Sequence, residues 1–295
     1  MNSPHRVLFD PSTGRPLLMA PQRHHRPRDT RPGAAAEEAC PFCAGREDQT
    51  PPEVDRIGDA AGWTARAFAN KYPACRWHEV IAEGPGHTSH PAQLSEDMLR
   101  DALKLWRRRI AFMESQEDVQ CAFLFKNVGF DAGSSIDHNH TQLLGLPMLP
   151  PRLTLELHQY QRHPDLYQRE IDSADAQGRV IFQAEHHVVL SPAAPKLPFE
   201  TWLLPRSETD DFLEEDHTQD LVTCLGAHFR AVGKGLDNPA LNSYLHRVPG
   251  EAFHWHMELQ PRTGTVAGLE LGADMSINSV TGEECAQLLR EALTA

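Results

Sequence analysis

The sequence predicts an α+β fold made of two similar halves, in which antiparallel sheets are flanked by helices. Segments typical of strands and of amphipathic helices alternate along all 295 residues, which exceeds the length of a usual single domain. Each half contains strands, then a helix of roughly 20 residues, then a strand that carries His-x-His. We therefore expect a duplicated fold, with halves at 1–165 and 166–295; chance spacing among the 17 histidines is the alternative.

The first half is predicted to begin with two short strands within residues 7–20, joined by a Pro/Gly turn and followed by a polar arm. Residues 32–52 are expected to be loop, and strands are expected at 63–74 and 78–85. The clearest amphipathic helix covers 94–115, where Ser95 is a suitable N-cap and acidic residues occupy the first turn. The strand pair around the first His-x-His motif follows.

In the second half, hydrophobic periodicity predicts a helix near 153–172, another over 216–236, and a closing helix at 284–294. The expected strands lie at 179–192, 199–206, 241–248 and 253–262. The last of these carries His254, His256 and Glu258 at a spacing of two, as in the first half.

The composition limits the classes of partner. The formal net charge is −13, which argues against a nucleic acid or an anionic membrane as the main partner. No apolar run reaches about 18 residues and no signal segment is evident, so we expect a cytoplasmic protein. A small anionic ligand is compatible with the arginines that gather within residues 1–35.

The segment SSIDHNHTQLLG, residues 134–145, contains the most informative pattern. His138, His140 and Gln142 alternate with other residues, and alternate side chains leave a β-strand on the same face. The apolar, aromatic stretches on both sides favour a strand over a helix. Two imidazoles and an amide are therefore expected to face one pocket.

A metal site is indicated by CPFC at 40–43, because two thiols at this spacing can reach one tetrahedral zinc ion. His138 and His87 are the best candidates for the remaining ligands, while His78 and His90 compete with His87. An ordinary pair of buried or redox-active thiols is the alternative reading of Cys40 and Cys43.

If His138 binds a metal, His140 is left with a different task. A neutral imidazole can attack phosphorus at neutral pH, since its unperturbed pKa lies near 6.5. The convergent Gln142 and the basic N-terminal arm favour phosphate chemistry, although a buried structural histidine or a third metal ligand would fit the same pattern.

Several motifs occur in the order found in the galactose-1-phosphate uridylyltransferase family, the transferase branch of the histidine-triad superfamily. The chain resembles that family in its opening strand pair, in CPFC, in the Arg-x-Phe-x-Asn-Lys-Tyr-Pro segment at 66–73, in FKNVG followed by His-x-His-x-Gln, and in the C-terminal His-x-His strand. The resemblance covers nearly the whole chain and implies a duplicated histidine-triad-like fold.

The resemblance implies nucleotidyl transfer in two steps. His140 would attack the α-phosphorus of a nucleotide-sugar, expel sugar 1-phosphate and carry the nucleotide until a second phosphate collects it. Gln142 would donate hydrogen bonds to phosphoryl oxygens. The expected activity is UDP-hexose:hexose-1-phosphate uridylyltransferase, with ADP-sugar or diadenosine polyphosphate phosphorylase as the alternative in the same fold. A noncatalytic protein that binds zinc or a nucleotide is the alternative of another class.

Other roles are implied by position alone. Zinc would be bound by Cys40, Cys43, His87 and His138, whereas the substrate would be bound by Arg23, Arg26, Asn70, Asn127, Ser135 and Glu270. A second metal ion, iron or zinc, would be bound by Glu170, His246, His254 and His256. The family is dimeric, which implies a homodimer whose chains contribute to each other's sites.

The sequence also departs from the family pattern. The usual His-Pro-His-Gly-Gln has Asn139 and Thr141 at its second and fourth positions, and the family's lysine near Gly264 is absent. The side chains of Asn139 and Thr141 would leave the strand on the face opposite to His138, His140 and Gln142. The expected chemistry is therefore compatible with these changes. Whether the donor carries uridine or adenosine stays open on these grounds.

Overall fold

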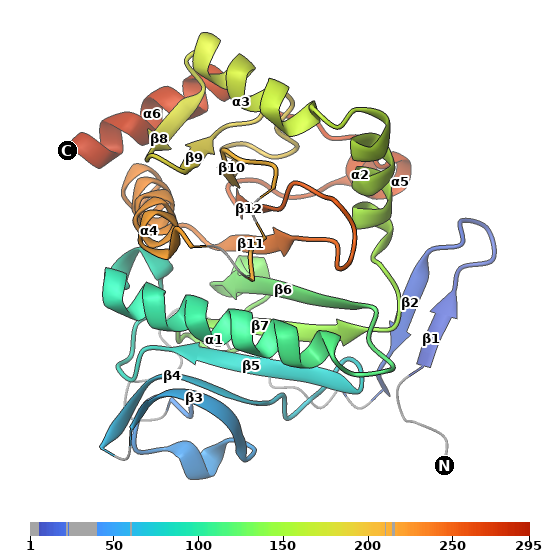
Figure 1. The fold of residues 1–295 in the computed structure, drawn as a ribbon, viewed down its shortest axis with the longest axis vertical. Coiled ribbons are helices and arrows are strands. Elements are labelled where there is room, and N and C mark those ends of the chain that lie inside the picture. The colour runs from blue at the N-terminus through green and yellow to red at the C-terminus, as the bar shows by residue number, and fades with distance from the viewer. Residues whose placement is uncertain (1–5, 22, 24–39, 60, 210, 214–215) are drawn as a thin grey trace.

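The main feature of the computed structural model is one ten-stranded antiparallel sheet, beside which a two-stranded hairpin stands apart (Figure 1). Residues 6–21, 23, 40–59, 61–209, 211–213 and 216–295 are described. The strands of the first half are β1 (Arg6–Phe9), β2 (Pro16–Met19), β3 (Glu53–Asp59), β4 (Gly62–Ala69), β5 (Trp77–Glu83), β6 (Cys121–Val128) and β7 (His140–Leu146). Those of the second half are β8 (Val180–Gln183), β9 (His187–Leu190), β10 (Thr201–Pro205), β11 (Leu241–His246) and β12 (His256–Pro261).

The helices connect and cover these strands. They are α1 (Glu96–Glu114), α2 (Pro151–Arg162), α3 (Leu166–Ala176), α4 (Thr218–Gly235), α5 (Gly268–Ala273) and α6 (Gly282–Thr294). Short 3-10 turns occur at η3 (Glu47–Gln49), η4 (Pro91–Gln93) and η5 (Phe130–Ala132).

The two halves of the sheet have the same topology. The order β3-β4-β5-β7-β6 in the first half corresponds to β8-β9-β10-β12-β11 in the second, and β6 pairs with β11 at the junction. A long helix separates the third and fourth strands of each half, namely α1 and α4. The predicted duplicated α+β fold is confirmed. The boundary predicted at residue 165 falls between α2 and α3, and it stays a prediction because both halves build one sheet.

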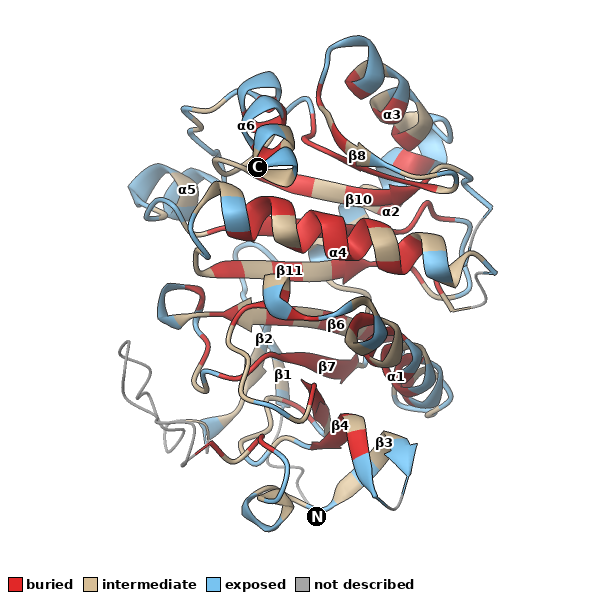
Figure 2. Ribbon diagram, turned by 90° about the vertical axis from the view of Figure 1, so that its left-hand side faces the viewer, coloured by how far each residue is buried: buried red, intermediate tan, exposed pale blue. Residues whose placement is uncertain are grey.

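The largest core lies between one face of the sheet and helices α1 and α4, which lie side by side. Figure 2 shows that α4 is buried along most of its length. Leu103 and Trp106 of α1 and Phe229 of α4 pack in this core together with sheet residues such as Leu143. Helix α1 begins as the sequence predicts, because Ser95 Oγ accepts a hydrogen bond from the Met98 amide at 3.2 Å.

The opposite face of the sheet is covered differently in the two halves. Helices α2 and α3 pack on the second half, where Tyr160 and Tyr167 meet Val188 and Leu204. On the first half, Phe42 of the loop that begins at Cys40 packs with other buried residues against β4 and β5. This loop leaves a pocket beside β7.

The structure corrects some predicted boundaries. The helix predicted near 153–172 is two helices, because Pro164 excludes the helical conformation at His163, whose φ and ψ are −136° and 77°. The strand predicted over 63–74 ends at Ala69, where the Asn70 side chain turns back to accept from the Tyr72 amide at 2.8 Å. The sequence analysis did not predict β3 or α5.

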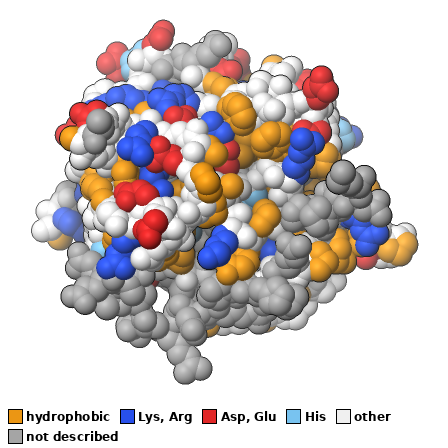
Figure 3. Space-filling model, turned by 90° about the horizontal axis from the view of Figure 1, so that it is seen from below, with side chains coloured by type: hydrophobic (Ala, Val, Ile, Leu, Met, Phe, Trp, Pro, Cys, Tyr) orange, Lys and Arg blue, Asp and Glu red, His pale blue; other side chains and the backbone are white. Residues whose placement is uncertain are grey.

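Within the described ranges, no helix combines the length and hydropathy needed to cross a membrane. The face seen in Figure 3 carries basic, acidic and apolar side chains interspersed with one another.

Candidate active site and metal centres

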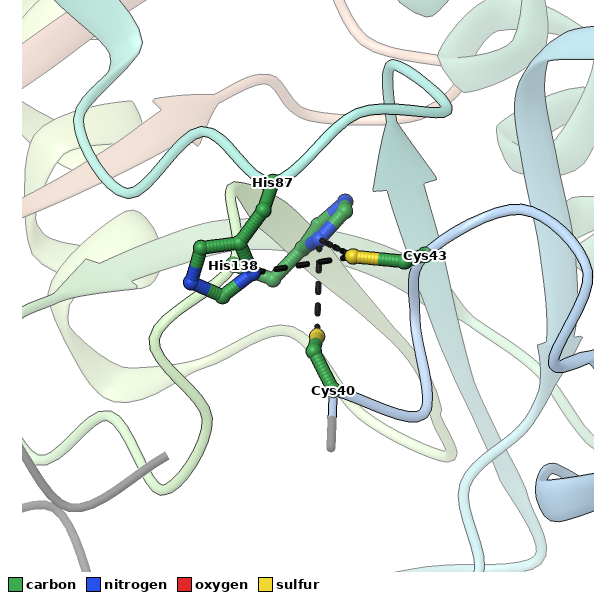
Figure 4. A group of neighbouring side chains, drawn as sticks. All are labelled: Cys40, Cys43, His87 and His138. Atoms are coloured by element: carbon green, nitrogen blue, oxygen red, sulfur yellow. Dashed lines mark hydrogen bonds between the residues drawn. The ribbon is translucent and has the colours of Figure 1, made fainter. Parts of the chain in front are cut away.

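Four side chains of metal-ligand type converge beside β7. Cys40 and Cys43 come from one tight turn, in which the Cys43 amide donates to the Cys40 carbonyl at 3.4 Å. His87 lies in the loop after β5, and His138 lies two residues before the start of β7. Figure 4 shows the four side chains pointing toward one another, and their ligand atoms all lie within 4.8 Å.

The spacing of these atoms fits a tetrahedral ion. His138 Nδ1 lies 3.6 Å from both sulfur atoms, and His87 Nδ1 lies 3.6 Å from Cys43 Sγ. Ordinary zinc–sulfur and zinc–nitrogen bonds at a tetrahedral angle place sulfur and nitrogen about 3.6 Å apart. His138 Nε2 lies 3.2 Å from the Gly84 carbonyl, so its proton occupies that nitrogen and Nδ1 can bind a metal. The predicted competitors, His78 and His90, lie outside this cluster.

His140 begins β7 and its ring is held from two sides. The Nδ1 atom lies 2.7 Å from the His138 carbonyl, which can only accept, so the neutral ring carries its proton on Nδ1 and its lone pair on Nε2. The ring of Phe42 stands edge-on to the imidazole with centroids 5.3 Å apart. His140 therefore has a defined tautomer and orientation.

The pocket in front of His140 has a volume of about 190 Å³. Its apolar wall includes Phe42, Phe68 and Val80, and its polar wall includes Asn70 and Gln142. Thr50, Lys71, Tyr72 and Ser135 also line it. An aromatic end next to amide and hydroxyl donors suits a planar base attached to a ribose phosphate.

Behind β7, on the face toward α1, lies a fully buried ion pair between Lys126 and Glu83. The Glu83 carboxylate also accepts from Trp106 Nε1 at 3.0 Å, from Asn139 Nδ2 at 3.1 Å and from the Thr141 hydroxyl. These last two residues are the departures from the family motif. They leave the opposite face from His140, as predicted, and complete a polar layer behind the strand.

The residues predicted to bind the substrate lie in several places. Asn70 and Ser135 line the pocket of His140, and Arg23 donates to the Tyr72 carbonyl at 2.5 Å beside it. Arg26 lies outside the described residues. Asn127 lines a neighbouring cavity and accepts from Asn242 Nδ2 at 2.8 Å.

Glu270 lies away from the His140 pocket of its own chain. It is in α5, where its carboxylate accepts from the Ala267 and Ile277 amides at 3.0 and 3.4 Å. These bonds close the loop around α5.

A second cluster lies in the other half, but its membership differs from the prediction. Glu156, His246, His256 and Glu258 place their ligand atoms within 4.8 Å of one another. Of the four residues predicted, only His246 and His256 belong to this group.

The other two predicted ligands have different partners. Glu170 lies on α3, where Arg179 donates to its carboxylate at 2.6 Å, because the helix break at Pro164 turns α3 away. His254 Nε2 lies 2.8 Å from the Pro205 carbonyl, which mirrors the contact of His138 with Gly84.

A guanidinium is already present at the second cluster. Arg152 donates to Glu156 at 2.9 Å and pairs with Glu258, which is fully buried, and Lys196 Nζ lies 3.8 Å from the same carboxylate. Burial opposes the ionisation of Glu258, but His256, His246 and Arg152 nevertheless lower its pKa. Two histidines and two carboxylates form a donor set for zinc or iron, and a cation there would share the carboxylates with Arg152.

Several site residues were missed by the sequence analysis. Phe42 could have been inferred from its place between the two cysteines, and Lys71 and Tyr72 from the motif that contains Asn70. Glu156 has no comparable signal, because it lies on a helix outside both His-x-His strands. Glu258 was noted in the sequence at the position that matches Gln142, but it was not predicted to be a metal ligand.

The fold and the two His-x-His strands together place this chain in the galactose-1-phosphate uridylyltransferase-like branch of the histidine-triad superfamily. Residues 110–295 match the family described as a domain of unknown function, DUF4921, and the chain belongs to that family. Residues 26–149 match the N-terminal domain of a second family of unknown function, DUF4931. Its relatives of named activity make it an enzyme of the uridylyltransferase-like branch, a nucleotidyltransferase or a phosphorylase.

Characterised relatives span most of the chain. ADP-glucose phosphorylase of Arabidopsis thaliana is 27% identical over 96% of this chain and 91% of its own length. Galactose-1-phosphate uridylyltransferase of Thermotoga maritima is 22% identical over 88% of this chain and 92% of its own length. The structure of the Arabidopsis thaliana ADP-glucose phosphorylase with bound ADP-glucose superposes with a TM-score of 0.78, covering 97% of this chain and 99% of that one at 27% identity.

Proposed function

We propose that this protein transfers a nucleotidyl group from a nucleoside-diphosphate sugar through a covalent intermediate on His140. The observation that carries the proposal is the orientation of His140, whose Nδ1 proton is directed to the His138 carbonyl while the ring lines the pocket. A noncatalytic nucleotide-binding protein has no need for an imidazole held in this tautomer. The reaction class is also supported by the relatives, which are named as a uridylyltransferase and a phosphorylase.

The first step forms one bond and breaks one. His140 Nε2 attacks the α-phosphorus, and the bond from that phosphorus to the bridging oxygen breaks, so that sugar 1-phosphate leaves with the electron pair. A phosphate leaving group needs no proton, which suits a site whose third motif residue is glutamine, a side chain that cannot act as an acid. An acceptor phosphate oxygen then attacks phosphorus and returns His140 to its neutral form.

We favour adenylyl transfer from an ADP-sugar to inorganic phosphate. The likeness to ADP-glucose phosphorylase covers 96% of this chain and 91% of that protein at 27% identity. The absence of the lysine near Gly264 also separates the chain from the uridylyltransferases. The second candidate is uridylyl transfer from a UDP-hexose to a hexose 1-phosphate, supported by uridylyltransferase relatives at 22% and 26% identity.

The two clusters of metal-type ligands would have different roles. The Cys40, Cys43, His87 and His138 set would hold a structural zinc ion that fixes His138, the residue whose carbonyl orients His140. The second cluster would hold zinc or iron only if Arg152 yields the carboxylates of Glu156 and Glu258. We retain the homodimer as part of the proposal, since it was implied by the family resemblance.

The deciding experiment is intact-protein mass spectrometry after separate incubation with ADP-glucose, UDP-glucose, UDP-galactose and diadenosine tetraphosphate. An acid-labile, base-stable nucleotide adduct that disappears in His140→Asn is expected, and its mass identifies the base. Adding inorganic phosphate or galactose 1-phosphate to the isolated adduct then identifies the acceptor. An adduct that persists in His140→Asn, or its absence with every donor while turnover proceeds, would refute the covalent role of His140.

A further inference from the structure

His78 joins the pocket to the catalytic strand through its two ring nitrogens. It is buried on β5 and leaves the same face of the sheet as Gln142, whose direct neighbour across the strands is Val80. The Ala74 amide lies 3.0 Å from His78 Nδ1, and the Gln142 carbonyl oxygen Oε1 lies 3.1 Å from His78 Nε2.

The backbone contact fixes the tautomer of the ring. A backbone amide can only donate, so His78 Nδ1 must present its lone pair to Ala74. The proton of the neutral imidazole then resides on Nε2 and is donated to Gln142 Oε1. An imidazolium would place a second proton on Nδ1, against the Ala74 amide.

The tautomer in turn decides which end of the Gln142 amide faces the ligand. The two ends of a glutamine amide have nearly the same shape, so its orientation is set by hydrogen-bond partners. With Oε1 held by His78, the NH2 group is the end available to the pocket that Gln142 lines. The flipped amide would set its NH2 against the His78 N–H and turn a carbonyl oxygen toward a phosphate.

The same histidine anchors the loop that contains Asn70. The Asn70 amide donates to the His78 carbonyl at 2.8 Å, and Asn70 Oδ1 accepts from the Tyr72 amide at 2.8 Å. This second bond directs Asn70 Nδ2 to within 3.1 Å of His78 Nε2. The NH2 group of an amide cannot accept a hydrogen bond. The N–H at His78 Nε2 therefore donates to Gln142 rather than to Asn70.

We propose that His78 is a positioning residue that holds the amide of Gln142 with its NH2 group toward the transferred phosphoryl group. This inference deepens the proposed function and rests on it for the identity of the ligand. In this role His78 acts through Gln142 and is not itself a donor to the phosphoryl group. Its effect is to make one end of Gln142 a donor to an anion before any substrate arrives, so that no reorganisation is needed during the reaction.

The first test reads the tautomer without any activity. Long-range proton–nitrogen correlation spectra of the zinc-loaded, nitrogen-15-labelled protein at pH 7.5 report which ring nitrogens carry protons, and His78→Leu identifies the signals of His78. We expect Nε2 to be protonated and Nδ1 unprotonated. The opposite tautomer, or an imidazolium, would overturn the proposal whether or not the protein forms an adduct.

The second test measures the rate of His140 adduct formation with the donor that labels the wild type. His78→Leu removes the donor to Gln142, and we expect the rate to fall about tenfold or more, with a smaller change in the donor concentration that gives half the maximal rate. His78→Gln restores one acceptor and one donor, so it should recover most of the rate.

His90→Leu is the matched control for this test. His90 is equally buried, and its Nδ1 accepts from the Ala92 amide at 3.2 Å, but this bond caps η4 and does not involve Gln142. It should leave the rate unchanged, while zinc content and unfolding temperature are compared across all variants. A wild-type rate in His78→Leu, or no recovery in His78→Gln, would contradict the positioning role; absence of any wild-type adduct would instead count against the proposed function alone.

Discussion

At the scale of single residues, the site depends on charges that lie behind it as well as on groups that face the ligand. Lys126 donates to the His140 carbonyl at 3.3 Å and to Asn139 Oδ1 at 3.0 Å, in addition to pairing with Glu83. These contacts hold the backbone of β7 from the side away from the pocket. They also give a physical reason for Asn139, since proline at that position could supply no amide to the buried pair.

The buried ion pair yields a prediction about stability. Lys126→Met leaves the Glu83 carboxylate buried without a cation, and we expect it to lower the free energy of unfolding by about 3–5 kcal/mol. Lys126→Met combined with Glu83→Gln should recover a substantial part of that loss, because no isolated charge remains. Urea unfolding monitored by tryptophan fluorescence measures both values.

The control for this prediction is an exposed ion pair. Arg76 and Asp118 lie 3.0 Å apart with most of the Arg76 side chain in solvent, so Arg76→Met should change stability by less than about 1 kcal/mol. Equal losses in Lys126→Met and in the double variant would show that the Lys126 side chain acts through packing and not through its charge.

At the scale of elements, the turn from Cys40 to Cys43 links the candidate metal site to the pocket. The same turn that presents both thiols also places Phe42 against His140 and against Phe68, whose ring centroid lies 5.2 Å away. His138 is a neighbour of the nucleophile on the same strand end. Three of the four metal-type ligands, the aromatic wall and His140 therefore lie on two short segments.

We expect Cys40→Ser to lose the zinc ion and, with it, the ordered position of Phe42. Elemental analysis should detect one zinc fewer per chain than in the wild type, and the unfolding temperature should fall, since metal binding contributes to folding free energy. The wild-type ratio also reports whether the second cluster holds a metal. An unchanged zinc content in Cys40→Ser would refute the assignment of Cys40 as a zinc ligand.

Much at this scale could be predicted from sequence, and the failures have physical causes. The 94–115 helix was correctly predicted because its periodicity and its Ser95 cap are local signals. Pro164 was a local signal for a helix break. The break was not predicted because the hydrophobic periodicity of the flanking residues is typical of one continuous helix. Glu156 and Arg152 were missed because their role depends on where α2 packs, which no short motif encodes.

At the scale of the whole molecule, buried histidines make stability depend on pH. Burial lowers the pKa of His228 to about 3 and that of His90 to about 4, below the usual value of 6.5. Between those values and 6.5 the unfolded chain binds protons that the folded chain does not. Stability is therefore fully present above pH 6.5 and is lost as the pH falls toward the folded-state pKa values.

The prediction for His228 isolates one of these groups. Its Nε2 atom lies 2.6 Å from the Thr201 hydroxyl, a contact that glutamine can replace without a titratable ring. From pH 8 to pH 5 the wild type should lose about 2 kcal/mol more stability than His228→Gln. Urea unfolding at several pH values measures the difference, and parallel curves for the two proteins would exclude a contribution from His228.

The matching of Gln142 with Glu258 across the two halves has a consequence for how the duplicated chain is used. The two residues occupy equivalent strands, yet one is an uncharged amide and the other a buried acid paired with Arg152. An acid at that point repels a phosphate, whereas an amide attracts it. At this one pair of equivalent positions the two halves thus differ in charge, so that an anionic ligand is compatible with the first position, whereas the charge at the second is already balanced by Arg152.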